Sequence, residues 1–263
     1  MHHQTIIEID HFSCTLNRKE ILKDIFLTIR EGEYLSIVGP NGSGKTTLLK
    51  CLVRILRGSG GRITIAGKEI ESFRQRDLAC LISYVPQADG RSSPFTVDEF
   101  LMMARYPYLS PFSSARKSDE KAVQAALDTT GTSHLANRLL ATLSGGERQK
   151  VFIAAALAQD TKVMLLDEPT TFLDPKHDTD VRALLSRINR IHGVTIVSVT
   201  HDINAAALAG GRIVALKKGA LVFNGGPGEF MEQGVLRTIY GTEFCIVNHP
   251  ATGGRLVVPG VLQ

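Results

Sequence analysis

One stretch of the chain matches the spacing G-x-x-x-x-G-K-S/T, and it reads Gly39-Pro40-Asn41-Gly42-Ser43-Gly44-Lys45-Thr46. Glycines let the backbone bring its N–H groups against phosphate oxygens, and the N-terminus of a following helix adds partial positive charge. We therefore expect a bound nucleoside triphosphate, with Lys45 at its β and γ phosphates and the Thr46 hydroxyl on Mg²⁺. Thr47 is counted with this segment, although its side chain is expected to face elsewhere. The alternative is a glycine-rich turn with a chance lysine, which the full match of the motif between a strand and a helix disfavours.

Two adjacent carboxylates form a second candidate group. Asp167 and Glu168 come directly after the apolar run at 163–166, and ligands of open α/β sheets bind at the carboxyl ends of such strands. We expect Asp167 to hold Mg²⁺ directly or through water, and Glu168 to polarise the water that attacks the γ phosphate. Standing alone, the pair would more simply be a helix N-cap followed by an acidic first turn.

A third group lies at the expected start of a helix, and it reads Leu143-Ser144-Gly145-Gly146-Glu147-Arg148-Gln149. Ser144 followed three residues later by Glu147 is a capping box, which predicts that a helix begins here. Gly145 and Gly146 leave room for a phosphate beside the backbone. As structure alone, the segment is a well-made helix start and implies no ligand.

Together these motifs resemble those of ABC ATPases, and the resemblance covers nearly the whole chain. It implies a P-loop NTPase core with a mainly parallel sheet, an antiparallel β subdomain and an inserted α-helical subdomain. It also implies ATP hydrolysis by a homodimer, in which Ser144, Gly145 and Gly146 of one copy face the γ phosphate of ATP held by the other. Two more residues match by position: Gln87, expected at Mg²⁺ or the water, and His201, expected at the γ phosphate. Without the other motifs, both would be ordinary loop residues.

Residues 104–109, 170–174 and 240–259 are similar to the subgroup that serves importers of iron-siderophores, haem and cobalamin. The similarity implies uptake of a metal chelate, two transmembrane permease subunits and, indirectly, a substrate-binding protein. It also implies a peripheral position at the cytoplasmic face of the inner membrane, held through the permease.

Other functions stay open as alternatives. The chain could be an ABC ATPase for another transported substrate. A soluble ABC ATPase of chromosome maintenance or translation is disfavoured, because the segment between Gln87 and Leu143 is short and the chain has one cassette. A P-loop kinase or GTPase would leave the segment at 143–149 without a purpose.

Strands and helices must position these groups. Apolar runs predict strands at 5–9, 25–29, 34–38, 62–65, 81–85, 163–166, 194–199, 212–216 and 221–223. The continuous apolar character of the last six of these runs favours a parallel sheet covered on both faces. Helical spacing predicts helices at 45–56, 119–129 and 147–158. We expect one domain over 1–263, with a helical subdomain at about 88–160 inserted in the nucleotide-binding core.

Composition narrows the partners. The 263 residues carry a net charge of +4, and the basic residues are scattered, so we expect no nucleic acid partner. The four cysteines lie far apart without a C-x-x-C pair, which predicts neither a disulfide framework nor a zinc site and fits a reducing, cytosolic location. The chain start lacks a signal-peptide pattern, and no run approaches the roughly 18 apolar residues of a membrane span. Membrane contact is therefore expected through a partner.

The chain departs from the family pattern at two positions. Leu16 stands where family members usually stack an aromatic residue on adenine, and whether Phe12 substitutes is left open. Ala155 stands where arginine is frequent. The aromatic segment 88–112 is expected to help receive a cytoplasmic helix of the permease, although its residues could equally fill a small core. These residues are Pro94, Phe95, Tyr106, Pro107, Tyr108, Pro111 and Phe112.

Overall fold

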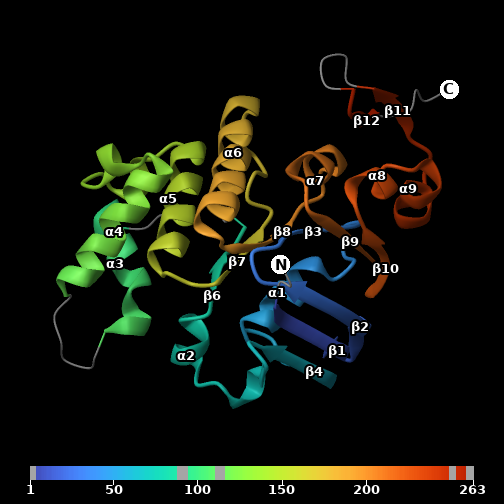
Figure 1. Ribbon diagram of the computed structural model, residues 1–263, viewed down its shortest axis with the longest axis horizontal. Helices are drawn as coiled ribbons and strands as arrows, with labels where there is room; N and C mark the ends of the chain where they lie inside the picture. Colours follow the sequence, from blue (N-terminus) through green and yellow to red (C-terminus); the bar gives the residue numbers. More distant parts are fainter. Residues whose placement is uncertain (1–3, 88–93, 110–115, 249–252, 259–263) are drawn as a thin grey trace. The chain divides into compact units, whose positions relative to one another are not determined.

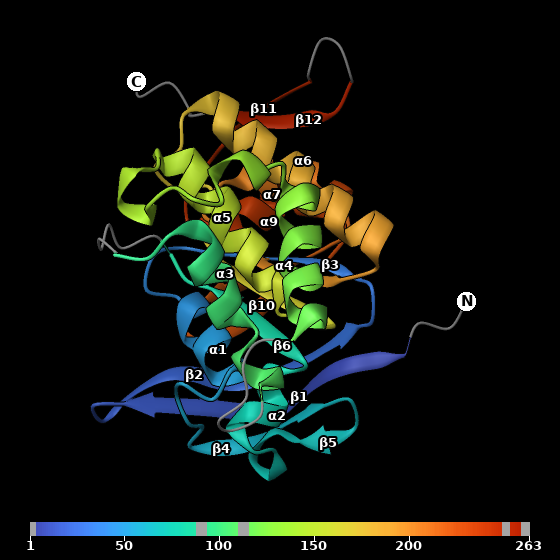
Figure 2. The ribbon, with the colours of Figure 1, turned by 90° about the vertical axis from the view of Figure 1, so that its left-hand side faces the viewer.

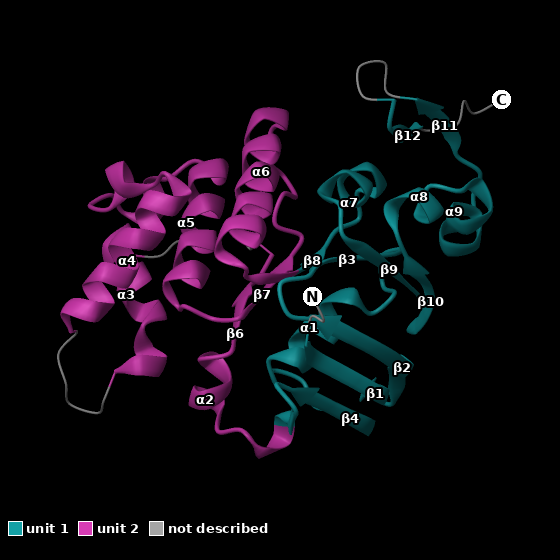
Figure 3. Cartoon of the chain, in the orientation of Figure 1, with its two compact units in different colours: residues 1–70, 197–263 teal, residues 71–196 magenta. Residues whose placement is uncertain are grey.

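The computed structural model describes residues 4–87, 94–109, 116–248 and 253–258. The chain divides into two compact units, of which unit 1 comprises residues 1–70 and 197–263 and unit 2 comprises residues 71–196 (Figure 3). The predicted helical segment at 88–160 falls inside unit 2 where it is described. Each unit is built around its own buried residues, and each carries some of the candidate site residues.

An antiparallel sheet opens unit 1. It contains β1 (Thr5–Leu16), β2 (Lys19–Arg30), β4 (Gly60–Ile65) and β5 (Lys68–Glu69), in the order β2-β1-β4-β5. These strands lie side by side in Figure 2. The hairpin between β1 and β2 turns through Asn17 and Arg18, which both have positive φ (48° and 64°), as the tightest hairpin turns require.

A second group of strands in unit 1 leads to the phosphate-binding segment. In it β3 (Tyr34–Val38) pairs in parallel with β9 (Arg212–Lys217), and β9 pairs antiparallel with β10 (Ala220–Gly225). Four of the five β3 residues are buried, which fits their mainly apolar sequence. The chain passes from β3 through a loop into α1 (Lys45–Leu52). Strand β8 (Thr195–Val199) has residues in both units.

The rest of unit 1 follows β8. It contains α7 (Ile203–Ala209), α8 (Pro227–Phe230), α9 (Gln233–Tyr240) and the hairpin of β11 (Cys245–Asn248) and β12 (Arg255–Val258). Phe230, Leu236 and Ile239 are fully buried in one apolar cluster with Val257. The Asn204 side chain joins the hairpin to α7, because it donates to the Val257 carbonyl at 2.9 Å and accepts from the Val257 N–H at 2.7 Å.

Unit 2 is mainly helical. It contains α2 (Gln75–Ala79), β6 (Ile82–Val85), α3 (Val97–Ala104), α4 (Lys117–Thr130), α5 (Gly145–Ala158), β7 (Val163–Asp167) and α6 (Pro175–His192). Short 3₁₀ helices lie at Ile70–Ser72, Tyr106–Tyr108, Ser133–Leu135 and Leu140–Thr142. The boundary in sequence between unit 1 and unit 2 falls within the first of them. Strands β6 and β7 pair in parallel. Helices α3, α4 and α5 pack on one another around Leu101, Leu127 and Val151 (Figure 1).

Three predictions about these elements are wrong in detail. The helix predicted at 45–56 ends at Leu52, because Arg54 takes a positive φ of 56° and Ile55 is 58% exposed. The strand predicted at 62–65 pairs antiparallel with β1. The strand predicted at 221–223 pairs antiparallel with β9 and is only partly buried, because it alternates between half-buried and exposed residues.

Candidate functional site

The loop between β3 and α1 is shaped for a close approach of backbone to phosphate. Gly39 has φ +138°, and a Cβ there would overlap the Leu216 carbonyl, so only glycine fits. The Lys45 ammonium donates to the carbonyl oxygens of Gly39 at 2.8 Å and Pro40 at 3.1 Å. Lys45 is only 6% exposed. These two hydrogen bonds wrap the loop around the Lys45 ammonium group and stabilise the loop conformation.

The start of α1 suits an anion. Its N-cap is Gly44, which makes no side-chain cap, and the first helical turn holds no acidic residue. The Ser43 hydroxyl is buried without a hydrogen-bond partner among the described residues. An orphaned hydroxyl beside an uncapped positive helix end fits a bound phosphate. Asn41 and Gly42 are exposed at the tip of the loop, and Thr46 and Thr47 are half-buried in the first turn.

His201 lies in unit 1 just after β8. The Thr200 N–H donates to the Ile37 carbonyl of β3 at 3.1 Å, and the Thr200 hydroxyl accepts from the Asp202 N–H at 3.1 Å. Asp202 caps α7 by accepting from the Ala205 N–H at 2.9 Å. The His201 side chain is exposed, and hydrogen bonds of its neighbours Thr200 and Asp202 fix the backbone on both sides of it.

Unit 2 carries the two carboxylates. Asp167 ends β7 and is 2% exposed, and the Tyr84 hydroxyl donates to its Oδ2 at 3.3 Å. Burial, and then the charge of Asp167, raise the pKa of the Tyr84 phenol above its ordinary range, so the phenol stays protonated and donates. A carboxylate is a ligand type that a hard cation such as Mg²⁺ prefers.

Glu168 is brought to Gln87. The Gln87 side-chain amide donates to Glu168 Oε2 at 3.2 Å, and the Thr171 hydroxyl donates to the same oxygen at 2.9 Å. Glu168 has a positive φ of 50°, which costs of order 1 kcal/mol or more and is typical of functional positions. Sequence reasoning missed Tyr84 and Thr171. The signal for each was a hydroxyl residue at a strand end or in the turn that follows it.

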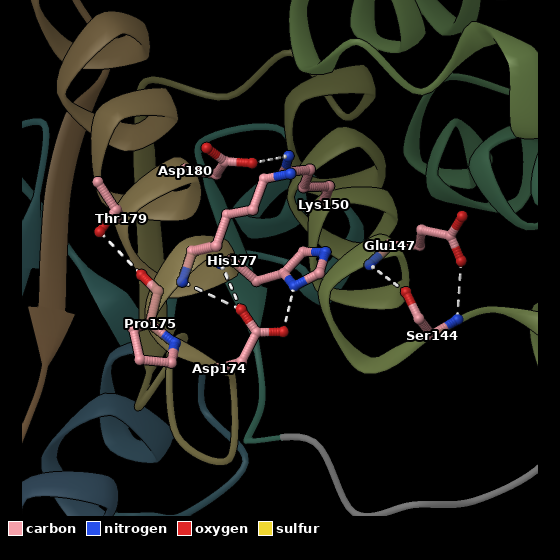
Figure 4. Close-up of polar contacts among 9 residues, drawn as sticks. Ser144, Glu147, Lys150, Asp174, Pro175, His177, Thr179 and Asp180 are labelled. Carbon is pink, nitrogen blue, oxygen red and sulfur yellow. Dashed lines mark hydrogen bonds and ion pairs between the residues drawn. The ribbon is translucent and has the colours of Figure 1, made fainter.

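The helix start predicted at Ser144 is present. The Ser144 Oγ accepts from the Glu147 N–H at 3.3 Å, and Glu147 Oε2 accepts from the Ser144 N–H at 2.8 Å (Figure 4). The Ser144 N–H, first of all, holds the pKa of the Glu147 carboxyl below its ordinary value. Gly145 and Gly146 form the first turn of α5. The glycines are therefore held at a fixed helix end.

The aromatic positions differ from what an adenine site needs. Phe12 is 5% exposed, and its ring packs so closely on Gly58 that a Cβ there would overlap it. Phe12 therefore belongs to the core of unit 1 and does not take the place of the missing stacking residue. Leu16 is half-buried at the end of β1.

Comparison with known proteins decides the family. The family model described as ABC transporter matches residues 22–171, more than half of the 263-residue chain. This chain belongs to the ABC transporter family. As a member it is an ATPase, and the family, the fold class and the enzymatic activity predicted from the sequence are confirmed.

The relatives of this ABC ATPase include importer components. It is 39% identical over 239 residues to the ferric enterobactin transport ATP-binding protein FepC of Escherichia coli K12, covering 91% of this chain and 88% of the relative. It is 38% identical to the iron(3+)-hydroxamate import ATP-binding protein FhuC of Bacillus subtilis 168, covering 88% and 86%.

Two solved structures extend the comparison. A chain of a transporter described as metal-chelate type, in an inward-facing conformation, is 25% identical with a TM-score of 0.85, covering 97% of this chain and 98% of that one. A dimeric ATP-binding cassette with ADP and phosphate is 29% identical with a TM-score of 0.72, covering 84% and 99%.

Unit 2 of the ABC ATPase also has an apolar cavity of about 480 Å³. Its lining includes Gln87, Phe100, Met103, Phe152 and Ala155. The cavity is therefore walled by α3 and α5 and reaches the glutamine that contacts Glu168. Among the described residues, no helix is both long and apolar enough to cross a membrane.

The aromatic segment predicted to receive the permease is only partly described. Residues 88–93, Pro111 and Phe112 lie outside the described residues. Pro94, Phe95, Tyr106, Pro107 and Tyr108 are described, and none of them lines the cavity. Phe100, Met103 and Phe152, which do line it, carried no recognisable motif. Only their meeting in space could have revealed them.

Proposed function

We propose that this chain is the ATP-hydrolysing subunit of an importer that takes up a metal chelate, with a ferric siderophore favoured over haem or cobalamin. The observation that carries the proposal is the pair of Asp167 and Glu168, with Gln87 hydrogen-bonded to the second. The names of the relatives, which concern ferric enterobactin and iron(3+)-hydroxamate, support the substrate class.

Each residue of the ATP site has a proposed role. The loop from Gly39 to Lys45 binds the phosphates through main-chain N–H groups, the Ser43 hydroxyl and the lysine. Thr46, Asp167 and Gln87 would hold Mg²⁺, which would neutralise charge on the phosphate oxygens. The donor set of one hydroxyl, one carboxylate and one amide oxygen suits this hard cation.

The reaction needs a base beside the attacking water. The Glu168 carboxylate orients the water and accepts its proton, while hydrogen bonds from Gln87 and Thr171 hold the carboxylate in place. His201 contacts the γ phosphate while its negative charge is redistributed during hydrolysis. Ser144, Gly145 and Gly146 of a second copy complete the site by presenting the positive end of α5 to that phosphate.

The assembly follows from these roles. We propose a homodimer bound to two transmembrane permease subunits, and through them to a substrate-binding protein. The chain then lies at the cytoplasmic face of the inner membrane without spanning it. The cavity beside Gln87 is the proposed seat for a permease helix, because it is apolar and lies next to a residue of the hydrolytic site.

Glu168→Gln tests this function. The amide cannot accept the proton from water, so ATP turnover should fall by at least about 100-fold, as for the loss of a general base. ATP binding should persist, and size-exclusion chromatography with ATP should show an accumulated dimer.

The matched control is Glu120→Gln, which removes a charge from an exposed position on α4. It should hydrolyse ATP like the parent. A Glu168→Gln variant that keeps full turnover, or that stays monomeric with ATP bound, would contradict the proposal.

A further inference from the structure

A histidine that no motif singles out touches both Asp174 and Gly146, one of the proposed site residues, in unit 2. His177 lies in the first turn of α6, and its Nδ1 is 2.6 Å from Asp174 Oδ2. Since the carboxylate accepts, Nδ1 carries the proton and donates. On its other side the His177 ring packs against Gly146, where an added Cβ would overlap the ring and lie 2.9 Å from the His177 Cβ. One imidazole therefore contacts both Asp174 and Gly146 of α5, and its hydrogen bond to Asp174 is drawn in Figure 4.

Asp174 is itself firmly held. Its Oδ1 accepts the N–H groups of Lys176 and His177, each at 3.0 Å, and so caps α6. The His177 N–H first, and then the His177 ring, hold the pKa of the Asp174 carboxyl below its ordinary value. The carboxylate therefore stays ionised at neutral pH and keeps its grip on the ring.

The contact is part of a wider seam between α5 and α6. Lys150, one turn after Gly146, forms an ion pair at 2.8 Å with Asp180, which lies three residues after His177. At Gly145, an added Cβ would meet the Leu173 side chain at 3.7 Å. The first turns of both helices thus lie together, and His177 is the side chain wedged between them.

We propose that His177 is a positioning residue for ATP hydrolysis, which fixes the first turn of α5 relative to Asp174 so that Gly146 meets the phosphate held by the second copy. The inference rests on the proposed function, because it concerns the surface that closes the dimer. The imidazole touches neither nucleotide nor water, and acts through the two backbone segments that it joins. Without the ring, Gly146 loses its support and the helix end gains freedom that dimer closure must remove.

Dimer closure in the Glu168→Gln background tests the inference. The ATP concentration that gives half-maximal dimer by light scattering should rise about fivefold in His177→Ala, the loss expected for one hydrogen bond with its packing. Binding of a fluorescent ATP analogue to the monomer should not change, because the phosphate loop is built by unit 1 alone. His177→Asn keeps a donor near the Nδ1 position and should recover part of the loss, whereas His177→Phe keeps a ring but no donor.

Gly146→Ala supplies a second test that does not depend on one variant folding. Its methyl group collides with the His177 ring, so closure should be impaired when His177 is present and should improve in the Gly146→Ala, His177→Ala double variant. Equal damage with and without the histidine overturns the inference, as does an unchanged half-point in His177→Ala when the parent dimerises. A parent that stays monomeric with ATP refutes the proposed dimer itself.

Discussion

Lys45 is a buried cation that contacts the carbonyl oxygens of its own loop. In Lys45→Ala the loop loses this support and the phosphates lose their nearest charge, so the Kd for ATP should rise by at least about 100-fold. Isothermal titration calorimetry measures it. Lys50→Ala, a half-buried lysine of the same helix, is the control and should bind ATP like the parent. A Kd for Lys45→Ala within about threefold of the parent would reject the assignment.

Single residues were predictable where the chain itself keeps them together. The loop at 39–46 and the pair of Asp167 and Glu168 are contiguous, so spacing alone carries their chemistry. Tyr84 and His177 are different, because each acts on a residue or segment that only folding brings to it. A hydroxyl residue at a strand end, or an imidazole in a helix, does not by itself tell from the sequence which residue it will contact.

The helices of unit 2 are tied at one end by a buried ion pair. Arg105, just after α3, lies 3.0 Å from Asp119 in the first turn of α4, with side chains 8% and 3% exposed. The Arg105 guanidinium also donates to the Ala158 carbonyl at the end of α5 at 2.7 Å, and lies 4.0 Å from the centre of the Tyr108 ring. One arginine therefore gathers the ends of three helices.

Asp119→Ala should destabilise the protein strongly, because it leaves the Arg105 charge buried without a counter-ion. The expected loss in the free energy of unfolding is about 3–5 kcal/mol, measured by urea titration at neutral pH. Glu120→Ala, an exposed neighbour, should change it by less than about 0.5 kcal/mol. A loss for Asp119→Ala as small as that of the control would show that the ion pair contributes little.

The same pair sets a pH dependence. The Arg116 N–H first, and Arg105 after it, hold the pKa of the Asp119 carboxyl below its ordinary value of 3.8. Because the folded pKa is lowered, the stabilisation is complete above the unfolded value and is lost as pH falls through the folded one. The difference between parent and Asp119→Ala should therefore hold from neutral pH to about pH 5 and shrink only in stronger acid.

The periodicity of the sequence predicted which segments form helices and strands better than it predicted how the strands pair. The strand at 34–38 and the helices around 119–129 and 147–158 have residue patterns that bury one face or both, and all three are present. The direction of pairing depends on which neighbour a strand finds. The segment 62–65 alternates polar and apolar residues, which is the pattern of an antiparallel strand with one face towards water, so β4 was misassigned when it was grouped with the continuous apolar runs.

At the scale of the whole molecule, the cavity beside Gln87 is the proposed docking site for a permease helix. Met103 lines it and is 46% exposed. Met103→Glu would place a charge where an apolar helix is expected, so recovery of the permease from detergent-solubilised membranes should fall by at least about tenfold. Ile191→Glu, which changes a 70% exposed residue of α6, should leave recovery unchanged.

Two different results would contradict the proposed docking site and the proposed transport function. Equal recovery of the permease with Met103→Glu would move the docking site elsewhere on the chain. Recovery of the parent only in soluble complexes, or with nucleic acid, would favour an ABC ATPase outside transport. Circular dichroism of each variant shows whether a lost partner reflects a lost fold.

The double hydrogen bond between Asn204 and Val257 makes the last strand an integral part of unit 1. Val257 is 8% exposed and shares an apolar cluster with Ile239 and Phe230. A chain truncated before this strand would lose the hydrogen bonds to the Asn204 side-chain amide and would expose the apolar cluster around Phe230 and Ile239 to water. Shortened forms are therefore expected to aggregate. The segment that carries His201 would also lose the hydrogen bonds that link the nearby Asn204 to the hairpin.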